Sequence, residues 1–213
     1  MKKRITKVTT KSGDDGTTGM ADGTRLKKSD PIINCVGEVD ELNSLVGYLS
    51  SVNDSERYKE SLIRIQNCLF DIGGSLSLST YDSISEEEIS FIEDEINLLN
   101  SDLPSLENFV LPGGHPTSAL AQVVRSVCRR CERSLVALDE EKSIEKKKII
   151  YINRLSDLLF VMARSINKEK ITKKYYGAKL NQGKIKRNPN QTTYQDQFYV
   201  QGLCQNDPLY FLF

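Results

Sequence analysis

Apolar residues recur every three or four positions along five stretches of this 213-residue chain, which places them on one face of an α-helix. Pro31 opens the first stretch and suits the first turn of a helix. In the second stretch, spacings of four and three alternate, which is typical of helices packed in a bundle. Ser85 and Glu88 form a capping box at the start of the third. The expected helices cover about residues 31–49, 58–76, 85–99, 117–138 and 144–170.

The two ends of the chain lack this periodicity. Residues 1–30 have the character of a loop, and together with residues 31–171, the helical bundle, they are expected to form one domain. Residues 172–213 are rich in Lys, Asn, Gln and Tyr without helical spacing, which predicts a divergent tail that need not be ordered. The predicted fold class is therefore all-α, a five-helix bundle with an irregular C-terminal tail.

The charges of the chain balance, with 29 lysines and arginines against 29 aspartates and glutamates. A nucleic-acid-binding protein would normally be basic, so no nucleic-acid partner is expected, and an anionic ligand would need a local group of positive charges. No apolar run approaches the roughly 18 residues of a membrane span, so no membrane partner is expected either. The N-terminal residues also lack the apolar segment of a signal peptide. These features favour the cytoplasm, or the mitochondrion if a presequence was removed.

Five cysteines, an odd number without regular spacing, indicate free thiols in a reducing compartment. Cys128 and Cys131 form a C-x-x-C pair inside a helical stretch. No second pair follows, and His115, the only histidine of the chain, is not at ligand spacing. The pattern favours buried thiols on a helix face over a metal or redox centre.

The fourth expected helix carries a row of arginines. Arg125, Arg129 and Arg133 follow one another at intervals of four on one face, where like charges repel by roughly 0.2–0.5 kcal/mol per pair. Arg130 adds a further positive charge, and Glu132 is the acid within the stretch that offsets them. A solvated charged face is one interpretation. The other is a polyanion or an acidic helix bound to this face, because the guanidinium fork binds phosphate and carboxylate in a bidentate way.

Polar residues on two other helices could take part in the same site. On the fifth, Asn153, Asp157 and Arg164 lie on one stripe beside the apolar seam and need partners if they are buried. Asp157 would pair with an arginine, whereas Asn153 could bind the edge of a ligand. The first helix carries three acids that could complement its N-terminus or pair with the arginine row, within or between chains: Glu38, Asp40 and Glu41.

Two loops are rich in glycine. "FVLPGG" places Phe109 and Val110 before a Pro-Gly-Gly turn, and its apolar tip is either a plug into the core or a wall for a flat ligand. "TKSGDDGTTG", residues 10–19, lacks the Walker A pattern. Its three glycines still permit a nest of backbone N–H groups that could hold an anion. Taken alone, it is a weak phosphate-binding signal.

Six blocks, in this order, resemble the PduO-type ATP:cob(I)alamin (corrinoid) adenosyltransferases: "TKSGDDGTTG", "KKSDP", "GEVDELNSLVGYL", "FVLPGG", "RSVCRRCER" and "INRLSDLLFVMAR". The resemblance covers roughly residues 6–170. It implies a five-helix bundle that assembles as a homotrimer with active sites between subunits. The implied reaction transfers the 5′-deoxyadenosyl group of ATP to the cobalt of reduced cob(I)alamin or a related corrinoid and releases triphosphate. It also implies Mg²⁺ bound with ATP, and a flavin-type corrinoid reductase and an adenosylcobalamin-dependent enzyme as partners.

The resemblance further implies roles for single residues. Arg129 would pair with Asp40 of a neighbouring chain, and Arg133 would act on ATP. Phe109 would form the apolar wall under the corrin ring that keeps the lower ligand away from cobalt. The residues that would bind ATP are Thr10, Lys11, Ser12, Gly13, Thr18, Gly19, Lys28, Arg133 and Asn153.

The chain departs from the family pattern in three places. Asp15 stands where many relatives carry a lysine, and it is either a ligand of Mg²⁺ or the mark of a weakened ATP site. Cys131 stands at a usual alanine position, and nothing after about Thr172 matches. Asp15 and the tail keep open a second function, a catalytically impaired carrier or sensor that binds corrinoid or ATP. A purely structural helical bundle is the third.

Overall fold

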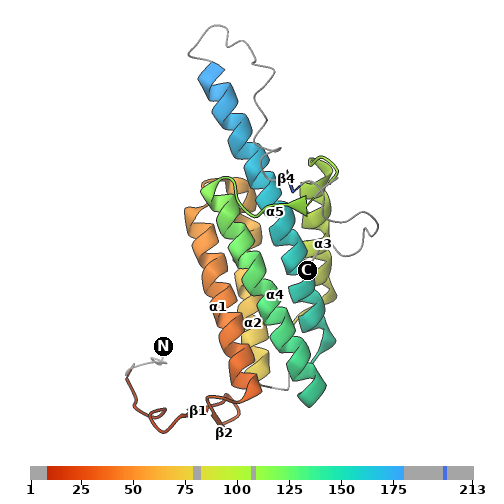
Figure 1. The fold of residues 1–213 in the computed structure, drawn as a ribbon. Coiled ribbons are helices and arrows are strands. Elements are labelled where there is room, and N and C mark those ends of the chain that lie inside the picture. The colour runs from red at the N-terminus through yellow and green to blue at the C-terminus, as the bar shows by residue number, and fades with distance from the viewer. Residues whose placement is uncertain (1–8, 79–82, 107–108, 180–198, 201–213) are drawn as a thin grey trace, which may run out of the picture.

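Five helices make up most of the computed structural model, which describes residues 9–78, 83–106, 109–179 and 199–200, with side chains as far as Lys170. The predicted all-α bundle is confirmed (Figure 1). The helices are α1 (Pro31–Val52), α2 (Lys59–Ser77), α3 (Glu86–Ser101), α4 (Pro116–Lys142) and α5 (Lys146–Lys179), with a 3₁₀ turn, η1 (Glu56–Tyr58), before α2.

The helices begin where local chemistry favours a start. The Asp30 side chain accepts a hydrogen bond from the backbone N–H of Ile32 (3.0 Å) and caps α1, and Pro31 occupies the first turn. Ser85 caps α3 as predicted, because its Oγ accepts from the backbone N–H of Glu88 at 3.3 Å. The Glu88 carboxylate binds Arg64 on α2 (2.8 Å) instead of returning to Ser85. This cap thus also links two helices.

The apolar stripes of the helices meet in one core. α4 lies against both α5 and α1, while α2 packs on α1 and α3 packs on α5. Leu42, Leu62, Leu135 and Leu159, from four different helices, are fully buried. Burying such a leucine contributes roughly 1.5–3 kcal/mol, so the core rather than helix propensity holds the bundle together.

The fifth helix is longer than predicted. Its expected end near Lys170 was wrong, since the backbone remains helical to Lys179 and α5 continues past the ends of its neighbours (Figure 1). Where α5 extends past its neighbours, it needs no apolar stripe for packing on another helix. Hydrophobic periodicity in the sequence therefore does not mark these turns. The added residues are three lysines, two tyrosines and one each of Ile, Thr, Gly and Ala; apart from the glycine, each costs a helix at most about 0.7 kcal/mol.

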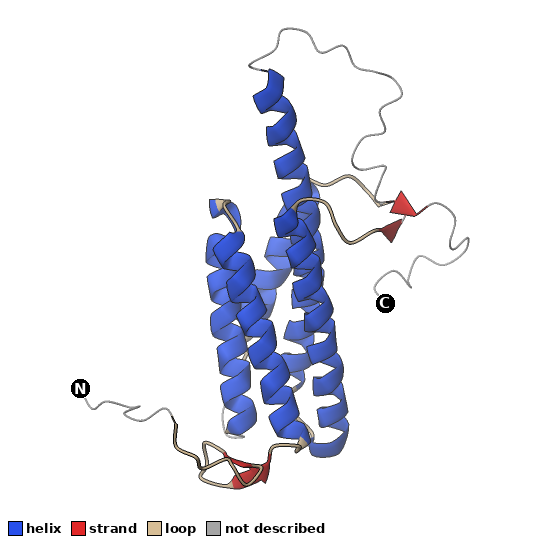
Figure 2. Ribbon diagram, turned by 60° about the vertical axis from the view of Figure 1, so that its left-hand side comes forward, coloured by secondary structure: helices blue, strands red, loops and turns tan. Residues whose placement is uncertain are grey.

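Two short strand pairs were not predicted. β1 (Thr17–Gly19) and β2 (Arg25–Lys27) form an antiparallel hairpin before α1. β3 (Phe109–Val110) pairs with β4 (Tyr199–Val200), from the predicted tail (Figure 2). Strands of two or three residues are too short to show alternation in a sequence. Among the helices of the described residues, none is both long and apolar enough to cross a membrane.

Candidate functional site

The N-terminal loop lies past the end of the bundle at which α1 begins, and it folds upon itself (Figure 1). Lys11 adopts a left-handed backbone conformation, with φ of 59°. The backbone N–H of Gly16 donates to the Gly13 carbonyl at 3.2 Å, and Thr10 Oγ1 lies 2.9 Å from Ser12 Oγ. Successive tight turns of this kind can direct backbone N–H groups toward an anion.

Lys28 lies over this turn. A Cβ atom added to Gly13 would come within 3.1 Å of Lys28 Nζ, and the Lys28 backbone N–H donates to the Gly16 carbonyl at 2.9 Å. The structure therefore brings the predicted phosphate contact next to a predicted ATP residue. Thr18 and Gly19 lie close by in β1, where they pair with β2.

Asp15 is engaged inside the same loop. Its Oδ1 accepts from the backbone N–H (2.9 Å) and the hydroxyl (2.8 Å) of Thr17. These hydrogen bonds lower the pKa of Asp15, so its carboxylate is ionised at neutral pH. Arg25 donates from Nε to Thr17 Oγ1 (3.0 Å) and from its terminal nitrogen to the Ser12 carbonyl, and it lies 3.7 Å from Asp15. Arg25, which the sequence did not single out, connects both ends of the turn.

The arginine row of α4 grades from half-buried to exposed. Arg125 donates to Gln122 Oε1 at 2.8 Å and lies 5.9 Å from the centre of the Phe160 ring on α5. Burial lowers the pKa of Arg125, with a smaller contribution from Arg129. Arg133 is exposed, and its guanidinium donates to the Arg129 carbonyl at 3.1 Å. The row thus presents an exposed guanidinium at its Arg133 end, hydrogen-bonded to the backbone of its own helix.

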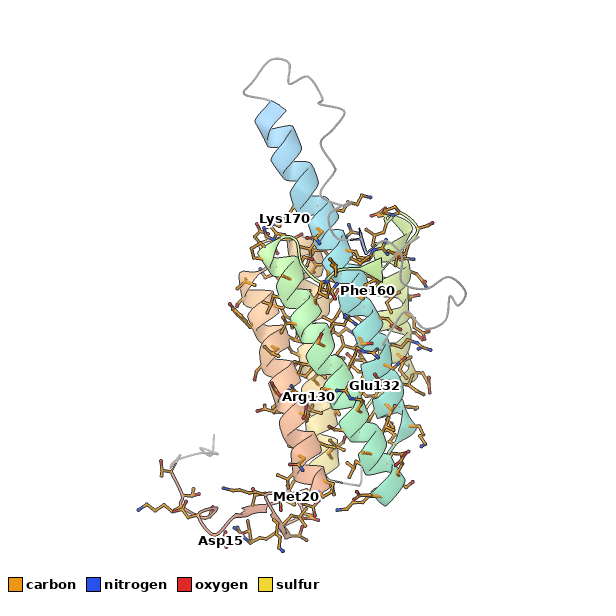
Figure 3. All side chains as sticks on the ribbon, viewed as in Figure 1. Asp15, Met20, Arg130, Glu132, Phe160 and Lys170 are labelled. Atoms are coloured by element: carbon orange, nitrogen blue, oxygen red, sulfur yellow. The ribbon has the colours of Figure 1, made fainter. Side chains whose placement is uncertain are left out.

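Asn153 lies on α5, on the side that faces α4, and has polar partners on both helices. Its Nδ2 donates to Glu132 Oε1 (2.8 Å), and its Oδ1 accepts from Arg154 (3.0 Å). Arg154 in turn binds Glu93 on α3 at 2.9 Å. Glu132, labelled in Figure 3, was expected only to offset charge, but it orients Asn153.

Asp157 lies one turn further along α5. Burial raises its pKa; the nearby positive charges of Arg154 and Arg129 lower it to a smaller extent, and Glu132 raises it. The two arginines act on its charge from nearby, yet desolvation prevails, and among the described residues no arginine forms the predicted ion pair with Asp157. Arg164, the third residue of the predicted stripe, donates instead to the Pro104 carbonyl.

The acids of α1 divide into two groups. Glu38 and Glu41 both bind Arg130 of α4 in the same chain, the former at 2.7 Å. Arg130 lies between the two helices (Figure 3), which confirms the within-chain alternative for these two acids. Asp40 is exposed on α1 and remains accessible to another chain.

The "FVLPGG" loop leaves β3 and turns into α4. The backbone of Phe109 is in β3, while its side chain lies outside what the structure describes. Leu111 is 45% exposed and Pro112 is exposed, so these two residues do not plug the core of their own chain, whereas the choice between plug and wall for Phe109 lies outside the described side chains. Pro112 and α4 side chains from Ala119 to Arg133 line a hollow of about 510 Å³.

The C-x-x-C pair is packed in the core. Cys128 and Cys131 are fully buried, and the Cys128 thiol donates to the Ile152 carbonyl at 3.2 Å. Burial raises the pKa of Cys131 to about 12, so this thiol is protonated. This environment fits the interpretation as structural thiols.

Within one chain, the two predicted halves of the ATP site lie apart. In the described part of the chain, the side-chain hydrogen bonds of the loop run among residues 10–32, except that Lys142 donates to Asp30 at 3.1 Å. Asp15 lies past the end of the bundle, whereas Glu132, which precedes Arg133, lies part-way along it (Figure 3).

The six blocks and this fold match one family. Its model, described as cobalamin adenosyltransferase, matches residues 8–166, three quarters of the chain. The chain belongs to the cobalamin adenosyltransferase family. The matched residues include the N-terminal loop, the arginine row and Asn153, and exclude the tail.

Curated relatives and solved structures agree with this assignment. A cobalamin adenosyltransferase of Cupriavidus metallidurans is 43% identical over 169 residues, 79% of this chain and 92% of that protein. A corrinoid adenosyltransferase of Bacillus subtilis is 38% identical, over 76% of this chain and 86% of its own. A variant of a PduO-type ATP:corrinoid adenosyltransferase from Lactobacillus reuteri, complexed with cobalamin and ATP, superimposes with a TM-score of 0.73 and 35% identity, covering 77% of this chain and 95% of that one.

Sequence reasoning missed three site residues of this adenosyltransferase-family chain: Arg25, Glu132 and Asn167, the last of which binds the turn before α4. Each acts through a partner 8 to 54 residues away. Hydrophobic periodicity in a sequence does not indicate which distant polar residues form a hydrogen bond. Asn153 itself was a candidate from its amide chemistry, and the resemblance added the expectation that its ligand is ATP.

Proposed function

We propose that the protein transfers the 5′-deoxyadenosyl group of ATP to the cobalt of reduced cob(I)alamin or a related corrinoid, releasing triphosphate and forming adenosylcobalamin. The observation that carries the proposal is the match, over 77% of the chain, to a PduO-type structure that holds both cobalamin and ATP. A family member with the same loop, arginine helix and bundle is expected to bind the same two substrates.

The residues that would bind ATP come from two walls. One is the turn of residues 10–19 with Lys28, whose ammonium rests against Gly13. The other consists of Arg133 and Asn153. Because the first wall stands off the end of the bundle, the second would come from a neighbouring chain. A homotrimer, with exposed Asp40 of one chain pairing with Arg129 of the next, supplies this geometry.

Mg²⁺ fits this site as an ion carried by ATP. The described residues contain no group of three His, Cys, Asp or Glu side chains that could hold a metal alone. Mg²⁺ commonly takes one or two carboxylates and completes its shell with phosphates and water. Asp15, whose second carboxylate oxygen is free of the Thr17 hydrogen bonds, is the candidate ligand. The ion would offset charge on the phosphates.

The reaction needs little from the protein beyond the positioning of the two substrates and electrostatic stabilisation of the leaving triphosphate. Cobalt(I) attacks C5′ of ATP, a Co–C bond forms, and the C5′–O bond breaks as triphosphate leaves with its electron pair. Lys28 and Arg133 would stabilise the charge that gathers on triphosphate. Asn153, held by Glu132 and Arg154, would orient the nucleoside so that C5′ faces cobalt. Phe109 would keep the lower ligand off cobalt. The four-coordinate cobalt(II) that results is easier to reduce.

The reaction places the protein between two others. A flavin-type corrinoid reductase would supply the electron that makes cob(I)alamin, and an adenosylcobalamin-dependent enzyme would take the product. The bacterial relatives favour the cytoplasm as the compartment.

The direct test is to incubate the protein with ATP, Mg²⁺ and chemically reduced cob(I)alamin and to follow the absorbance change to adenosylcobalamin. We expect turnover well above a protein-free control, with one triphosphate released per adenosylcobalamin. The absence of product above that control would refute the enzyme.

The same assay separates a second candidate, a catalytically impaired carrier or sensor. The observation behind it is the ionised Asp15 carboxylate beside the residues that would hold triphosphate. Stoichiometric binding of ATP and corrinoid without turnover would favour it, and equilibrium dialysis with ATP measures that binding. A purely structural bundle would bind neither ligand saturably.

A further inference from the structure

The turn between β3 and α4 is held by one side chain of α5. Asn167 accepts a hydrogen bond at Oδ1 from the backbone N–H of His115 (2.8 Å) and donates from Nδ2 to the Gly113 carbonyl (3.0 Å). Both polar atoms of its amide thus form hydrogen bonds with the backbone of a loop more than 50 residues earlier in the chain. A single amide that binds two loop residues fixes the loop in both position and orientation.

Two neighbours complete this clamp. The hydroxyl of Ser118, which is fully buried, lies 2.8 Å from the Ala163 carbonyl of α5 and 3.3 Å from the same Gly113 carbonyl. Gly114 has φ of 99°, and a Cβ there would come within 2.3 Å of Asn167 Oδ1. The turn approaches Asn167 so closely that only glycine fits.

The clamp does not hold a core segment in place. Leu111 and Pro112, directly before Gly113, are exposed, and Pro112 forms one wall of the hollow whose other end is Arg133. Three residues separate Gly113 from Phe109, and one of them is Pro112, whose backbone angle φ is restricted. Only Val110 and Leu111 remain to absorb a shift of Gly113, so we expect such a shift to move Phe109 as well.

We infer that Asn167 is a positioning residue for the corrinoid half of the site: it fixes the "FVLPGG" loop, and with it Phe109, against the helix that also carries Asn153. The inference rests on the proposed function, in which Phe109 forms the wall under the corrin ring. It predicts a selective defect. Loss of the clamp should disturb the handling of corrinoid while ATP binding persists, because the N-terminal loop is distant and Asn153 and Arg133 are held by partners other than Asn167.

The test compares Asn167→Ala and Asn167→Asp in the full chain with the unaltered protein. Asp keeps an acceptor for the His115 N–H but cannot donate to the Gly113 carbonyl, so it removes half of the clamp. Asn67→Ala is the matched control, because Asn67 donates only to the Ile63 carbonyl within its own exposed helix face. For each protein, we would measure KM for ATP, the rates from cob(I)alamin and from cob(II)alamin, and the spectrum of bound cob(II)alamin with ATP present.

We expect Asn167→Ala to leave KM for ATP within about twofold and to slow the cob(II)alamin route by about tenfold to hundredfold, since small misplacements of a positioned group have effects of this size. The share of four-coordinate cob(II)alamin in the spectrum should fall in parallel. Asn167→Asp should lie between alanine and the unaltered protein, and Asn67→Ala should match the latter.

Two results overturn the inference. In the first, the unaltered protein is active, and the Asn167 variants lose ATP and corrinoid function equally or lose neither. The clamp would then be only a contact at the start of α4, and the proposed function would stand. Inactive unaltered protein would remove both. If Asn167→Ala does not fold, Asn167→Asp together with the cob(II)alamin spectrum decides between the outcomes.

Discussion

The two glycine-rich loops of this protein are held in opposite ways. In the N-terminal loop, Asp15 binds Thr17 two residues away, and Arg25 reaches Ser12 and Thr17 across 8 to 13 residues. In the "FVLPGG" loop, the anchor is Asn167 on α5, more than 50 residues away. The first loop is shaped by its own sequence, and the second by the bundle.

This difference suits the two substrates. A loop held by exposed, short-range hydrogen bonds opens at little cost, so in the proposed site it would adapt when ATP and a neighbouring chain arrive. A loop fixed to a packed helix is in place before any ligand binds, so in the proposed site little ordering cost would fall on corrinoid binding. We therefore expect changes in the first loop to act mainly on KM for ATP, and changes in the second to act on corrinoid chemistry.

The largest effect should come from Arg133→Ala, the exposed guanidinium that would meet the neighbour's loop. Loss of a donor to developing negative charge typically reduces rate by about 10²–10³, so kcat/KM for ATP should fall by that factor. Arg133→Lys should fall less, because it keeps the charge but not the bidentate fork. Steady-state kinetics at varied ATP provide the measurement.

Arg57→Ala is the matched control, because it removes an arginine that lies in η1 instead of on α4 and whose partner is Asp102 (3.2 Å). An unchanged kcat/KM for Arg133→Ala would exclude Arg133 from the site and break the pairing of loop and arginine row.

Phe109→Ala should have the next largest effect, and on the other substrate. Removing an aromatic wall gives up roughly 1.5–3 kcal/mol of apolar contact, which corresponds to about tenfold to hundredfold on the cob(II)alamin route. The route from chemically prepared cob(I)alamin should suffer less, because there the lower ligand is already absent. Parallel assays from both oxidation states measure the ratio; equal losses would assign the loop a role in packing alone.

A smaller, ATP-specific effect is expected from Asp15→Asn and Arg25→Ala. Arg25→Ala removes hydrogen bonds worth about 0.5–1.5 kcal/mol, so KM for ATP should rise roughly threefold to tenfold with the corrinoid KM unchanged. Asp15→Asn keeps an acceptor for Thr17 but removes the negative charge that lies 3.7 Å from Arg25, so its KM for ATP should rise by less. Asp22→Asn is a close control, since Asp22 binds Thr24 just as Asp15 binds Thr17, but contacts no arginine.

The double variant sharpens this prediction. If Asp15 and Arg25 act as one unit, its effect should be smaller than the product of the single effects. A fall in KM for Asp15→Asn would instead mean that the carboxylate repels triphosphate, and a changed Mg²⁺ requirement would mean that it binds the ion.

The smallest effect should come from a chain ending at Lys170, which lacks β4. The pairing of β4 with β3 involves two residues on each strand, so the cob(II)alamin route should slow by at most about threefold and KM for ATP should not change. Side-by-side kinetics of the full and shortened chains provide the test. A loss as large as that of Phe109→Ala would show that the tail, and not only Asn167, anchors the second loop.

The sequence by itself determined the helices and the family, and it supplied most of the candidate site residues. Hydrophobic spacing is local, so it located five helices and their starts at Pro31 and Ser85. Only the tertiary structure decided which polar groups meet: Asn153 with Glu132, Arg130 with Glu38 and Glu41, and Asn167 with the turn at Gly113. It also decided where α5 ends, at Lys179, beyond the end that the sequence predicted. Such pairs depend on how helices cross and face one another, and these are properties of the packed chain.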